Sequence, residues 1–549
     1  MKKKKYFLLV LIFLSFIMFF YFNQKKGFHE DEIYSYGSSN YKYDNIYKSY
    51  GYTSKELDYF WNVTFKGNLF NRVGNSLDFL LNMNKKDFSY REDLTKKEPI
   101  LKTKEDANEY LSIQKEDLGN YFSVWLNQAI DVHPPLFYFC LHFFSIFSFN
   151  HFSKIVGFAL NLLFFILTLI GMKKILTLEG KDEFSLPAII FYGMSMAAIS
   201  TVMFQRMYMM LTCFTVWYLY YLWKFTKEDL SKKDKRIFSL IITGGFLTQY
   251  YFCIYVVTSF ITYVILNWPD KRKIKDLFLI HFKGAILGLI LYPVAIYQVL
   301  FSSRGIVGHE NIAKTYLEML TYFIQNIFSK LNLNIILTVI LSIGLVYVVW
   351  KKKLFKQKEF HLLLLPIILS LLIISKISPF LGNSFTFRYI MLLYPLIVIL
   401  IFYILSFIKS KKLPVVLLVI SILLGVSGMI LERPTYLYEE YQESLDIAQN
   451  NKDDNIIYVV DNDFTFLNAM PEFLIYKKHL IIDINENDLG QIKALKEVSQ
   501  DNEAILCIKS WLDTDKIKDD ILNNTDFTKA ELIADVSKDT LSTYYKLTK

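Results

Sequence analysis

Cysteine is scarce in this sequence, and the few cysteines present follow no ligand pattern. There are four among 549 residues: Cys140, Cys213, Cys253 and Cys507. The first three lie in apolar segments, where a cysteine behaves as a small buried hydrophobic residue, and the fourth stands alone in the C-terminal tail. The sequence therefore predicts neither a disulfide framework nor a zinc site.

Glycine-rich phosphate loops of the P-loop or dinucleotide type are also missing, as are internal repeats and low-complexity tracts. A chain that hydrolyses ATP to drive transport needs such a loop. A soluble nucleotide-binding domain on the cytoplasmic side is not visible either. These absences argue against an ATP-driven transporter and against a nucleotide-sugar donor.

Charged residues make up only 21% of the chain, whereas 53% of its residues are hydrophobic. The apolar residues gather in runs such as 6–22, 276–300 and 413–430, each long enough to cross a hydrocarbon core of roughly 30 Å as a helix. The net charge of +9 comes from lysines and arginines grouped in short loops between these runs, which is typical of oriented membrane proteins and not of nucleic-acid binders. We expect an integral membrane protein.

Basic loops decide the predicted topology. No small-residue cleavage site follows the first apolar run, so we expect a retained helix with a cytoplasmic N-terminus. Placing each basic loop in the cytoplasm gives eleven crossings: 6–22, 154–172, 184–203, 207–223, 237–249, 250–267, 276–300, 335–350, 360–376, 388–408 and 413–430. That count requires 135–149 to stay in the outer half of the membrane without crossing. The C-terminal tail is then external.

Two regions are expected outside the membrane. Residues 24–133 form a long first external loop, whose scattered apolar residues suit short amphipathic helices lying on the membrane, and its length predicts a function. The tail, 432–549, alternates strand-like runs such as 456–460 and 504–508 with polar helical stretches, which predicts a small α/β domain. Residues 1–431 are expected to form one polytopic α-helical domain.

The predicted topology gathers charged residues on the external face: Glu30, Asp31, Glu32, Asp131, His133, Arg206, Arg304, His309, Glu310 and Arg388. Arg206 and Arg388 each open an apolar segment. A guanidinium deep in a spanning segment costs about 2.5–3.5 kcal/mol, and this cost falls towards zero at a segment end, so one interpretation of each arginine is an interfacial anchor. The other is a site for an anionic lipid phosphate.

A carboxylate placed near such arginines would complete a site for glycosyl transfer. Displacing a phosphate from an anomeric carbon requires charge stabilisation on the leaving side and removal of the acceptor proton on the other. Arginines or carboxylates alone would be weak support for this chemistry. Their combination on one face predicts it.

Four motifs in this order resemble the GT-C membrane glycosyltransferases: Asp31-Glu32-Ile33-Tyr34 after the first helix, His133-Pro134-Pro135 at the end of the first loop, Arg206-Met207-Tyr208, and Arg388-Tyr389 before Tyr394-Pro395. Within that superfamily the sequence looks most like glycosyltransferase family 39, the protein O-mannosyltransferases, and the aminoarabinose transferase that modifies lipid A. The resemblance covers about residues 1–430. It implies a GT-C fold, a polyprenyl-phosphate sugar donor and transfer on the external face.

The resemblance also implies roles for single residues. Asp31 becomes the general base, with Glu32 supporting its position, and Arg206 and Arg388 meet the donor phosphate, for which Arg304 is a further candidate. Relatives often carry a second acidic residue near the Arg-Met-Tyr block, where this chain has Phe204-Gln205. The second carboxylate or positioning group therefore stays open among Asp131, His133 and Glu310.

Simpler interpretations stay open for three of these features. The acidic run Glu30-Asp31-Glu32 is compatible with a solvated loop start, and His133 before two prolines with a cap on a buried helix. His309 and Glu310 have ligand-type side chains, and some relatives use a divalent ion, but two residues do not make a metal site. A divalent metal is thus left open, and no other cofactor is expected.

The sequence thus predicts a multi-pass plasma-membrane glycosyltransferase that uses a lipid-linked sugar donor. Its partners are an acceptor hydroxyl on an envelope glycan, lipid or protein, and the surrounding membrane lipids; no nucleic acid is expected. The rival hypothesis is a non-enzymatic carrier or flippase of lipid-linked sugars, which needs the arginines but not the base. Transporters commonly show paired halves with Gly- or Pro-broken segments in corresponding positions, and we find neither in this sequence.

Overall fold

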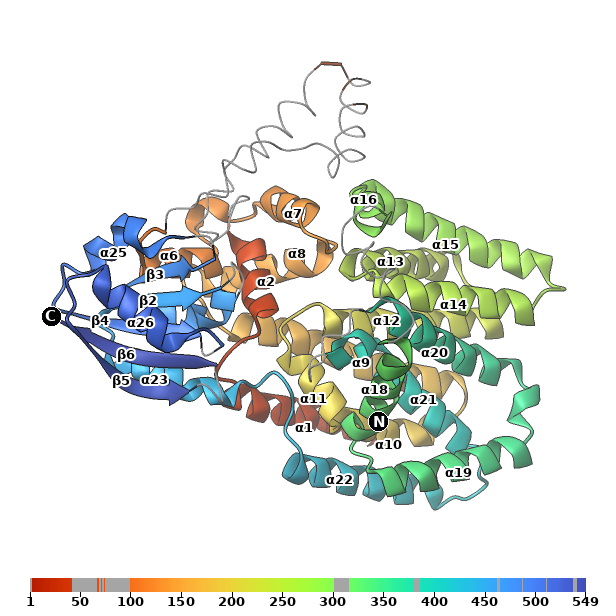
Figure 1. Cartoon of the computed structure of the whole chain (residues 1–549). Helices are drawn as coiled ribbons and strands as arrows, with labels where there is room; N and C mark the ends of the chain where they lie inside the picture. The colour runs from red at the N-terminus through yellow and green to blue at the C-terminus, as the bar shows by residue number, and fades with distance from the viewer. Residues whose placement is uncertain are drawn as a thin grey trace. The chain divides into compact units, whose positions relative to one another are not determined.

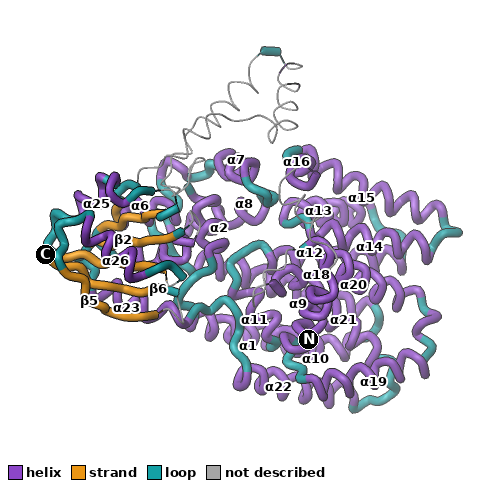
Figure 2. Tube along the Cα trace, in the orientation of Figure 1, coloured by secondary structure: helices purple, strands orange, loops and turns teal. Residues whose placement is uncertain are grey.

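The computed structural model describes residues 2–41, 67–68, 71, 74, 99–300, 315–378, 386–461, 465–485, 487–509, 511–536 and 541–549. The chain divides into two compact units (Figures 1 and 2). The helical unit consists of Met1–Asn23, Asp131–Phe137 and Gly157–Thr435. The sheet unit consists of Gln24–Ile130, Tyr138–Val156 and Tyr436–Lys549, so it joins the region after the first helix to the C-terminal tail.

The described part of the helical unit is built from helices, because its apolar runs are long and rarely interrupted. In chain order they are α1 (Lys2–Gln24), α9 (Ile155–Leu178), η3 (Asp182–Phe184), α10 (Ser185–Gly193), α11 (Met196–Met203), α12 (Tyr208–Lys227), α13 (Lys232–Thr248), α14 (Tyr251–Leu266), α15 (Lys271–Leu291), α16 (Ala295–Leu300), α18 (Thr315–Lys330), α19 (Ile335–Lys351), η4 (Leu354–Lys356), α20 (Lys358–Ile377), η5 (Thr386–Leu393), α21 (Tyr394–Leu405) and α22 (Leu413–Leu431), where η marks a 3₁₀ helix. Each of the eleven predicted segments overlaps between one and three of these helices.

Five described segments are long and apolar enough to cross a membrane: Lys5–Gln24, Ile155–Leu178, Lys358–Ile377, Thr386–Leu405 and Leu413–Leu431. Two bent pairs raise the number to seven if each pair is one span: Asp182–Gly193 with Met196–Met203, bent by 59°, and Tyr316–Lys330 with Ile335–Lys351, bent by 94°. These helices fit a polytopic helical membrane protein. The four further crossings that α12, α13, α14 and α15 would supply stay predictions, because these helices are shorter or carry several lysines and tyrosines.

Asn332 lies at one of the two bends in the helical unit, and its side chain bonds to backbone groups at the other. Asn332, between α18 and α19, adopts a left-handed conformation with φ of 61°. Its Oδ1 accepts from the backbone N–H of Met196 at 3.1 Å, and its Nδ2 donates to the carbonyls of Met194 at 3.1 Å and of Leu424 in α22 at 3.3 Å. Backbone groups that leave helical geometry inside an apolar layer need such partners, so Asn332 stabilises the break between α10 and α11.

The sheet unit mixes helices and strands. Its described elements are α2 (Glu30–Asn40), β1 (Lys102–Thr103), α6 (Lys104–Leu111), η1 (Lys115–Asp117), α7 (Tyr121–Ile130), α8 (Leu136–Ser145), η2 (Ile146–Ser148), η6 (Glu439–Tyr441), α23 (Gln442–Asn450), β2 (Asn455–Val460), η7 (Thr465–Ala469), α24 (Met470–Phe473), β3 (Lys478–Asp483), η8 (Leu489–Gln491), α25 (Lys493–Val498), β4 (Glu503–Lys509), α26 (Thr514–Asn523), β5 (Lys529–Val536) and β6 (Ser542–Thr548). The ten residues of α8 are too few to cross roughly 30 Å of hydrocarbon, in keeping with the expectation for 135–149.

The sheet has six strands in the order β1-β3-β2-β4-β6-β5. β2 pairs in parallel with both β3 and β4, whereas β6 pairs antiparallel with β4 and β5. β1 pairs antiparallel with β3 through Lys102 and His479. The predicted domain boundary assigns the whole of 24–133 to the helical domain. β1 lies within 24–133, however, and it adds a strand to the sheet that the C-terminal tail forms.

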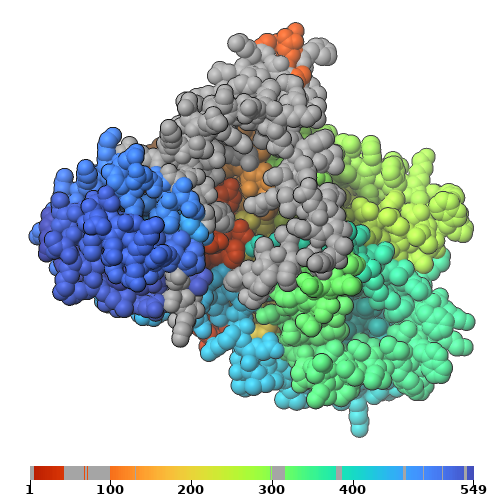
Figure 3. Space-filling view, viewed as in Figure 1, coloured from red at the N-terminus to blue at the C-terminus, as the bar shows by residue number. Residues whose placement is uncertain are grey.

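The two faces of the sheet differ because side chains alternate along each strand. Ile457, Leu480 and Leu506 point into an apolar core that α25 and α26 complete with Leu495 and Ile521. The opposite face carries buried polar and aromatic residues, among them Tyr458, Cys507, Lys509 and Tyr544. In Figure 3 the residues of the tail, drawn in blue, form one closely packed mass.

Candidate functional site

Three predicted site residues of the helical unit lie in contact. The Nδ1 atom of His133 is 2.7 Å from a carboxylate oxygen of Asp131, and its Nε2 atom is 3.5 Å from a terminal nitrogen of Arg206. Arg206 is only 2% exposed. Because a guanidinium can only donate, Nε2 accepts from Arg206 and the proton of a neutral imidazole lies on Nδ1, towards Asp131. We call this arrangement the Asp131–His133–Arg206 cluster.

Side chains from the end of α15 and from α16 hold the backbone of this cluster. Gln298 in α16 donates to the carbonyl of Asp131 at 2.6 Å and to the hydroxyl of Tyr292 at 2.9 Å. Tyr292 donates to the carbonyl of His133 at 3.4 Å, and Tyr250 donates to Gln298 at 2.6 Å. Sequence reasoning missed Gln298, although a polar side chain inside the apolar run 276–300 was a signal for it.

Arg206 lies in the break between α11 and α12, and this break is also held by a buried amide. Asn161 in α9 donates to the carbonyls of Val202 at 3.0 Å and Phe204 at 2.7 Å. The backbone N–H of Arg206 then donates to the carbonyl of Phe204 at 2.7 Å. Phe204-Gln205 supply no carboxylate beside Arg206, and Asp131 is a carboxylate that reaches Arg206 through His133.

The cluster favours the ionised form of Asp131. Burial raises the pKa of this carboxyl, but the charge that His133 carries when its ring is protonated, the hydrogen bond from His133 and the positive charge of Arg206 act in the opposite direction. The net result is a pKa below the ordinary value. Asp131 therefore carries its negative charge at neutral pH.

Arg388, the second predicted phosphate ligand, lies in η5, which packs against α12. Its guanidinium carbon is 5.3 Å from the ring centre of Tyr389, and a terminal nitrogen is 3.4 Å from the Tyr389 hydroxyl. Tyr389 stacks on Tyr251, with ring centres 5.4 Å apart, and the Tyr251 hydroxyl is 3.0 Å from that of Ser378. An aromatic pair thus supports the guanidinium in the same unit that holds Arg206.

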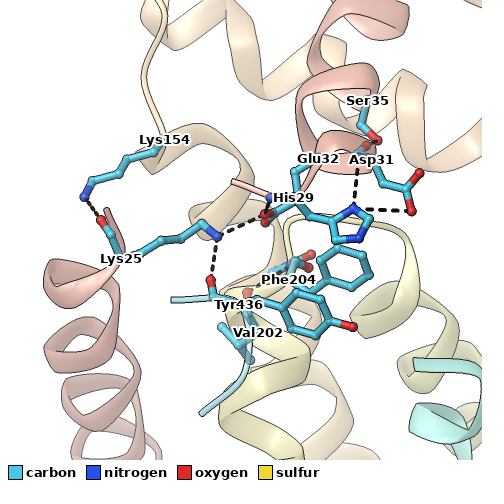
Figure 4. Close-up of polar contacts among 10 residues, drawn as sticks. Lys25, His29, Asp31, Glu32, Ser35, Lys154, Val202, Phe204 and Tyr436 are labelled. Atoms are coloured by element: carbon cyan, nitrogen blue, oxygen red, sulfur yellow. Dashed lines mark hydrogen bonds and ion pairs between the residues drawn. The ribbon is translucent and has the colours of Figure 1, made fainter. Parts of the chain in front are cut away.

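Asp31 and Glu32 lie at the start of α2 in the sheet unit (Figure 4). His29 caps the helix, since its Nδ1 accepts from the backbone N–H of Asp31 at 3.1 Å, and Glu32 accepts from the backbone N–H of His29 at 2.8 Å. The Asp31 side chain is 22% exposed and its carboxylate lies 3.7 Å from the His29 ring nitrogen. Glu32 is fully buried. The two neighbouring carboxylates are therefore in different environments.

Lys25 is the partner of Glu32 that sequence reasoning missed. Its Nζ atom is 3.0 Å from the Glu32 carboxylate and donates to the carbonyl of Tyr436 at 2.7 Å, while its own carbonyl accepts from Lys154 (Figure 4). Lys25 is completely buried, which lowers its pKa, whereas the attraction of Glu32 acts in the opposite direction. A lysine on the predicted external side of the first helix runs against the positive-inside pattern and was a signal. Glu32 therefore belongs to a buried ion pair.

Three further predicted site residues, Arg304, His309 and Glu310, lie outside the described residues. The metal hypothesis that rests on His309 and Glu310 is therefore not addressed by the structure. Within the described ranges, no group of three or more His, Cys, Asp or Glu side chains could hold a metal ion.

Comparison with known proteins gives a structural likeness only. No family model and no curated protein matches the chain. Two of the solved structures that resemble it are of ArnT. One is ArnT from Cupriavidus metallidurans in the apo state, with a TM-score of 0.47 and 11% identity, and the other is ArnT from the same organism bound to undecaprenyl phosphate, with a TM-score of 0.46 and 12% identity. Each match covers 75% of this chain and 87% of the other chain. With TM-scores below 0.5, this likeness assigns no residue role or substrate to the chain.

Proposed function

We propose that this chain is a membrane glycosyltransferase that takes a sugar from a polyprenyl-phosphate carrier and transfers it to an acceptor hydroxyl on the external face. The observation that supports the proposal most directly is the Asp131–His133–Arg206 cluster. An interfacial anchor would leave its guanidinium among lipid headgroups, whereas Arg206 is 2% exposed and contacts His133, itself bonded to an ionised carboxylate. Such a preorganised guanidinium suits an anionic leaving group.

The proposed reaction is a direct displacement. The acceptor oxygen forms a bond to the anomeric carbon, the bond from that carbon to the carrier phosphate breaks, and the phosphate leaves with the bonding electrons. Arg206 and Arg388 bind the departing phosphate, because the planar guanidinium matches two phosphate oxygens at once. Asp31 accepts the acceptor proton, the role that the resemblance gives it.

Asp131 and His133 act through Arg206 in this proposal. The carboxylate fixes the imidazole by accepting from Nδ1, and the imidazole then presents Nε2 to the guanidinium. Since Gln298 and Tyr292 hold the backbone of both residues, the guanidinium has little freedom to swing away. Asp131 is thus the second carboxylate of the proposed machinery, in a positioning role.

The test is a transfer assay in proteoliposomes that contain polyprenyl-phosphate sugars. Wild-type protein is compared with Asp31→Asn and with Glu116→Gln, which changes an exposed carboxylate of the same predicted loop. We expect release of polyprenyl phosphate, with gain of sugar by extracted envelope material, from the wild type and Glu116→Gln but not from Asp31→Asn. If the lipid binds and no form releases phosphate, the transferase proposal is wrong and a carrier becomes the better explanation.

A further inference from the structure

The carboxyl edge of the sheet, where β2, β3 and β4 end, carries side chains that the proposed reaction does not use. β2 lies between β3 and β4, so the chain runs from β2 to one side and then crosses to the other. In parallel sheets, ligands bind outside the carboxyl ends of the strands at such a reversal. Asp461 follows β2, Lys509 ends β4, and Trp511 comes two residues later.

Trp511 is exposed and yet held in one orientation. Its side chain is 46% exposed, and its indole N–H donates to the Asp461 carboxylate at 2.8 Å. Asp461 is located in turn by Asn485, whose side-chain amide donates to the Asp461 carbonyl at 2.6 Å. The backbone N–H of Asn485 donates to Asp483, at the end of β3, at 2.9 Å. A pinned indole offers a flat apolar face that loses little conformational freedom when a ligand stacks on it.

Lys509 stands behind this indole. It is 1% exposed, and its Nζ atom lies 5.8 Å from the ring centre of Trp511, 5.4 Å from that of Tyr458 and 3.3 Å from the Ser542 hydroxyl. Glu30, the first residue of α2, is among the charges that act on this ammonium. α2 also packs against η7, the 3₁₀ helix after β2. The edge and the acidic start of α2 therefore belong to one neighbourhood of the sheet unit.

The chemistry of this edge fits a sugar better than an anion. The C–H groups of a pyranose ring stack on an indole, and its hydroxyls donate hydrogen bonds to a carboxylate such as that of Asp461, while the buried Lys509 lies behind the ring. A phosphate would be repelled by Asp461 and Asp483, and no glycine-rich loop opens a helix here. An anionic membrane surface is disfavoured for the same reason, since Asp513 follows Trp511 by two residues.

We propose that the edge formed by Asp461, Lys509 and Trp511 is a carbohydrate-binding site that receives the acceptor glycan. Carbohydrate binding is argued from the edge itself, whereas its use as an acceptor site rests on the proposed transferase function. The acceptor class is then a glycan, in preference to a protein hydroxyl.

The test uses the full chain in lipid nanodiscs with maltotetraose, chitotetraose and tetragalacturonate as neutral, amino-sugar and acidic probes. Saturation-transfer NMR and titration should show that at least one probe binds. Trp511→Ala should weaken binding about tenfold or more, and Trp511→Phe, which keeps a ring, less than about threefold. Phe122→Ala removes a different exposed ring of the sheet unit, 50% exposed, and should leave binding unchanged.

Three outcomes would overturn the proposal: none of the probes binds the wild type, Trp511→Ala binds as well as Phe122→Ala, or a threonine-rich peptide binds through Trp511 while the sugars do not. Release of polyprenyl phosphate is measured on the same preparations. Sugar binding without any release would remove the transferase function and leave the carbohydrate site. Release without sugar binding would support the transferase function and rule out the carbohydrate site.

Discussion

His133 and Asp131 share a hydrogen bond of 2.7 Å in a segment whose backbone is held at both residues by Tyr292 and Gln298. Because Arg206 approaches the other imidazole nitrogen, this hydrogen bond decides how the guanidinium is presented. The ionised Asp131 carboxylate cannot bind an anionic phosphate. Its role is to orient His133 and, through His133, the guanidinium of Arg206. Replacing it should misplace the arginine without removing it.

We therefore expect Asp131→Asn to lower kcat/KM for the lipid donor by about 100-fold, the cost typical of a misplaced binding group. The pKa of Asp131 is below its ordinary value, so any stability it contributes is present above the unfolded-state pKa and is lost only as the pH falls through the lower folded-state pKa. The ratio of wild-type to variant rates should then be constant from pH 5.5 to 8.5. Steady-state rates across that range, with exposed Asp229→Asn as the control, check this expectation. A ratio that changes across this range would contradict the purely orienting role of an ionised Asp131.

Substitutions of the neighbouring residues Glu32 and Asp31 should have different effects, the first on stability and the second on activity. Glu32→Gln leaves the buried Lys25 ammonium without its carboxylate and should lower the free energy of unfolding of the sheet unit by about 3–5 kcal/mol. The double variant Lys25→Met, Glu32→Leu should recover much of that loss. Asp31→Asn, at a side chain 22% exposed, should change stability by less than about 0.5 kcal/mol and abolish transfer.

The measurement for this pair uses Cys507, which is buried on β4. In a chain whose other three cysteines are alanine, the temperature at which Cys507 becomes reactive to a thiol reagent reports unfolding of the sheet unit. Equal unfolding temperatures for Glu32→Gln and the wild type would show that the ion pair is not structural.

Sequence periodicity predicted the long apolar helices and the strand-like runs that form β2 and β4, because both depend on local patterns. The runs 413–430 and 456–460 correspond to α22 and β2 almost to the residue. The bends were not predictable, since the break at Met194 depends on Asn332, which lies 138 residues further along the chain. The pairing of β1 with β3 escaped prediction for the same reason, because a two-residue strand has no periodicity of its own.

The candidate site was predictable as a set of residue types but not as a set of contacts. Asp131, His133 and Arg206 were all candidates, and the structure brings them together. Gln298 and Asn161 support these residues, and both are polar side chains in apolar helices. A hydropathy pattern records such side chains only as interruptions of an apolar run, so their contacts were not predicted. The motif also presents Asp31 and Glu32 as one acidic pair, whereas in the structure Asp31 is partly exposed and Glu32 is completely buried.

Glu472 in α24 should make the sheet unit sensitive to pH. It is 2% exposed, and burial raises its pKa from 4.5 to about 7, although the hydrogen bond from Tyr544 and the charge of Lys509 oppose the shift. The other titratable groups beside it are the phenols of Tyr441, Tyr458 and Tyr476 and the thiol of Cys507. Their pKa values are all raised by burial, so Glu472 is the group among them that titrates near neutral pH.

The sign follows from the tighter proton binding of the folded state. The stabilisation from protonated Glu472 is complete below pH 4.5 and is lost as the pH rises to about 7, which amounts to roughly 3 kcal/mol. Glu472→Gln should thus match the wild type at pH 4.5 and be more stable at pH 8. The test is the temperature at which Cys507 becomes reactive to a thiol reagent, measured for the variant and the wild type at each pH. If the two proteins differed in this temperature by the same amount at pH 4.5 and pH 8, the prediction would be wrong.

Asn332 should be essential to the bent helices of the helical unit. Asn332→Leu removes three hydrogen bonds to backbone groups of Met196, Met194 and Leu424, of which the first two lie at the break between α10 and α11. Gly428 shows how tightly the side chain is enclosed, since a Cβ there would lie 2.4 Å from it. We expect the free energy of unfolding of the helical unit to fall by about 3 kcal/mol or more. Buried Cys213 should then react with a thiol reagent at a lower temperature than in the wild type. Asn334→Ala, which removes only the N-cap of α19, should cost about 1 kcal/mol. If the two asparagine variants behave alike, Asn332 is no more than a helix-end residue and the two bends do not depend on each other.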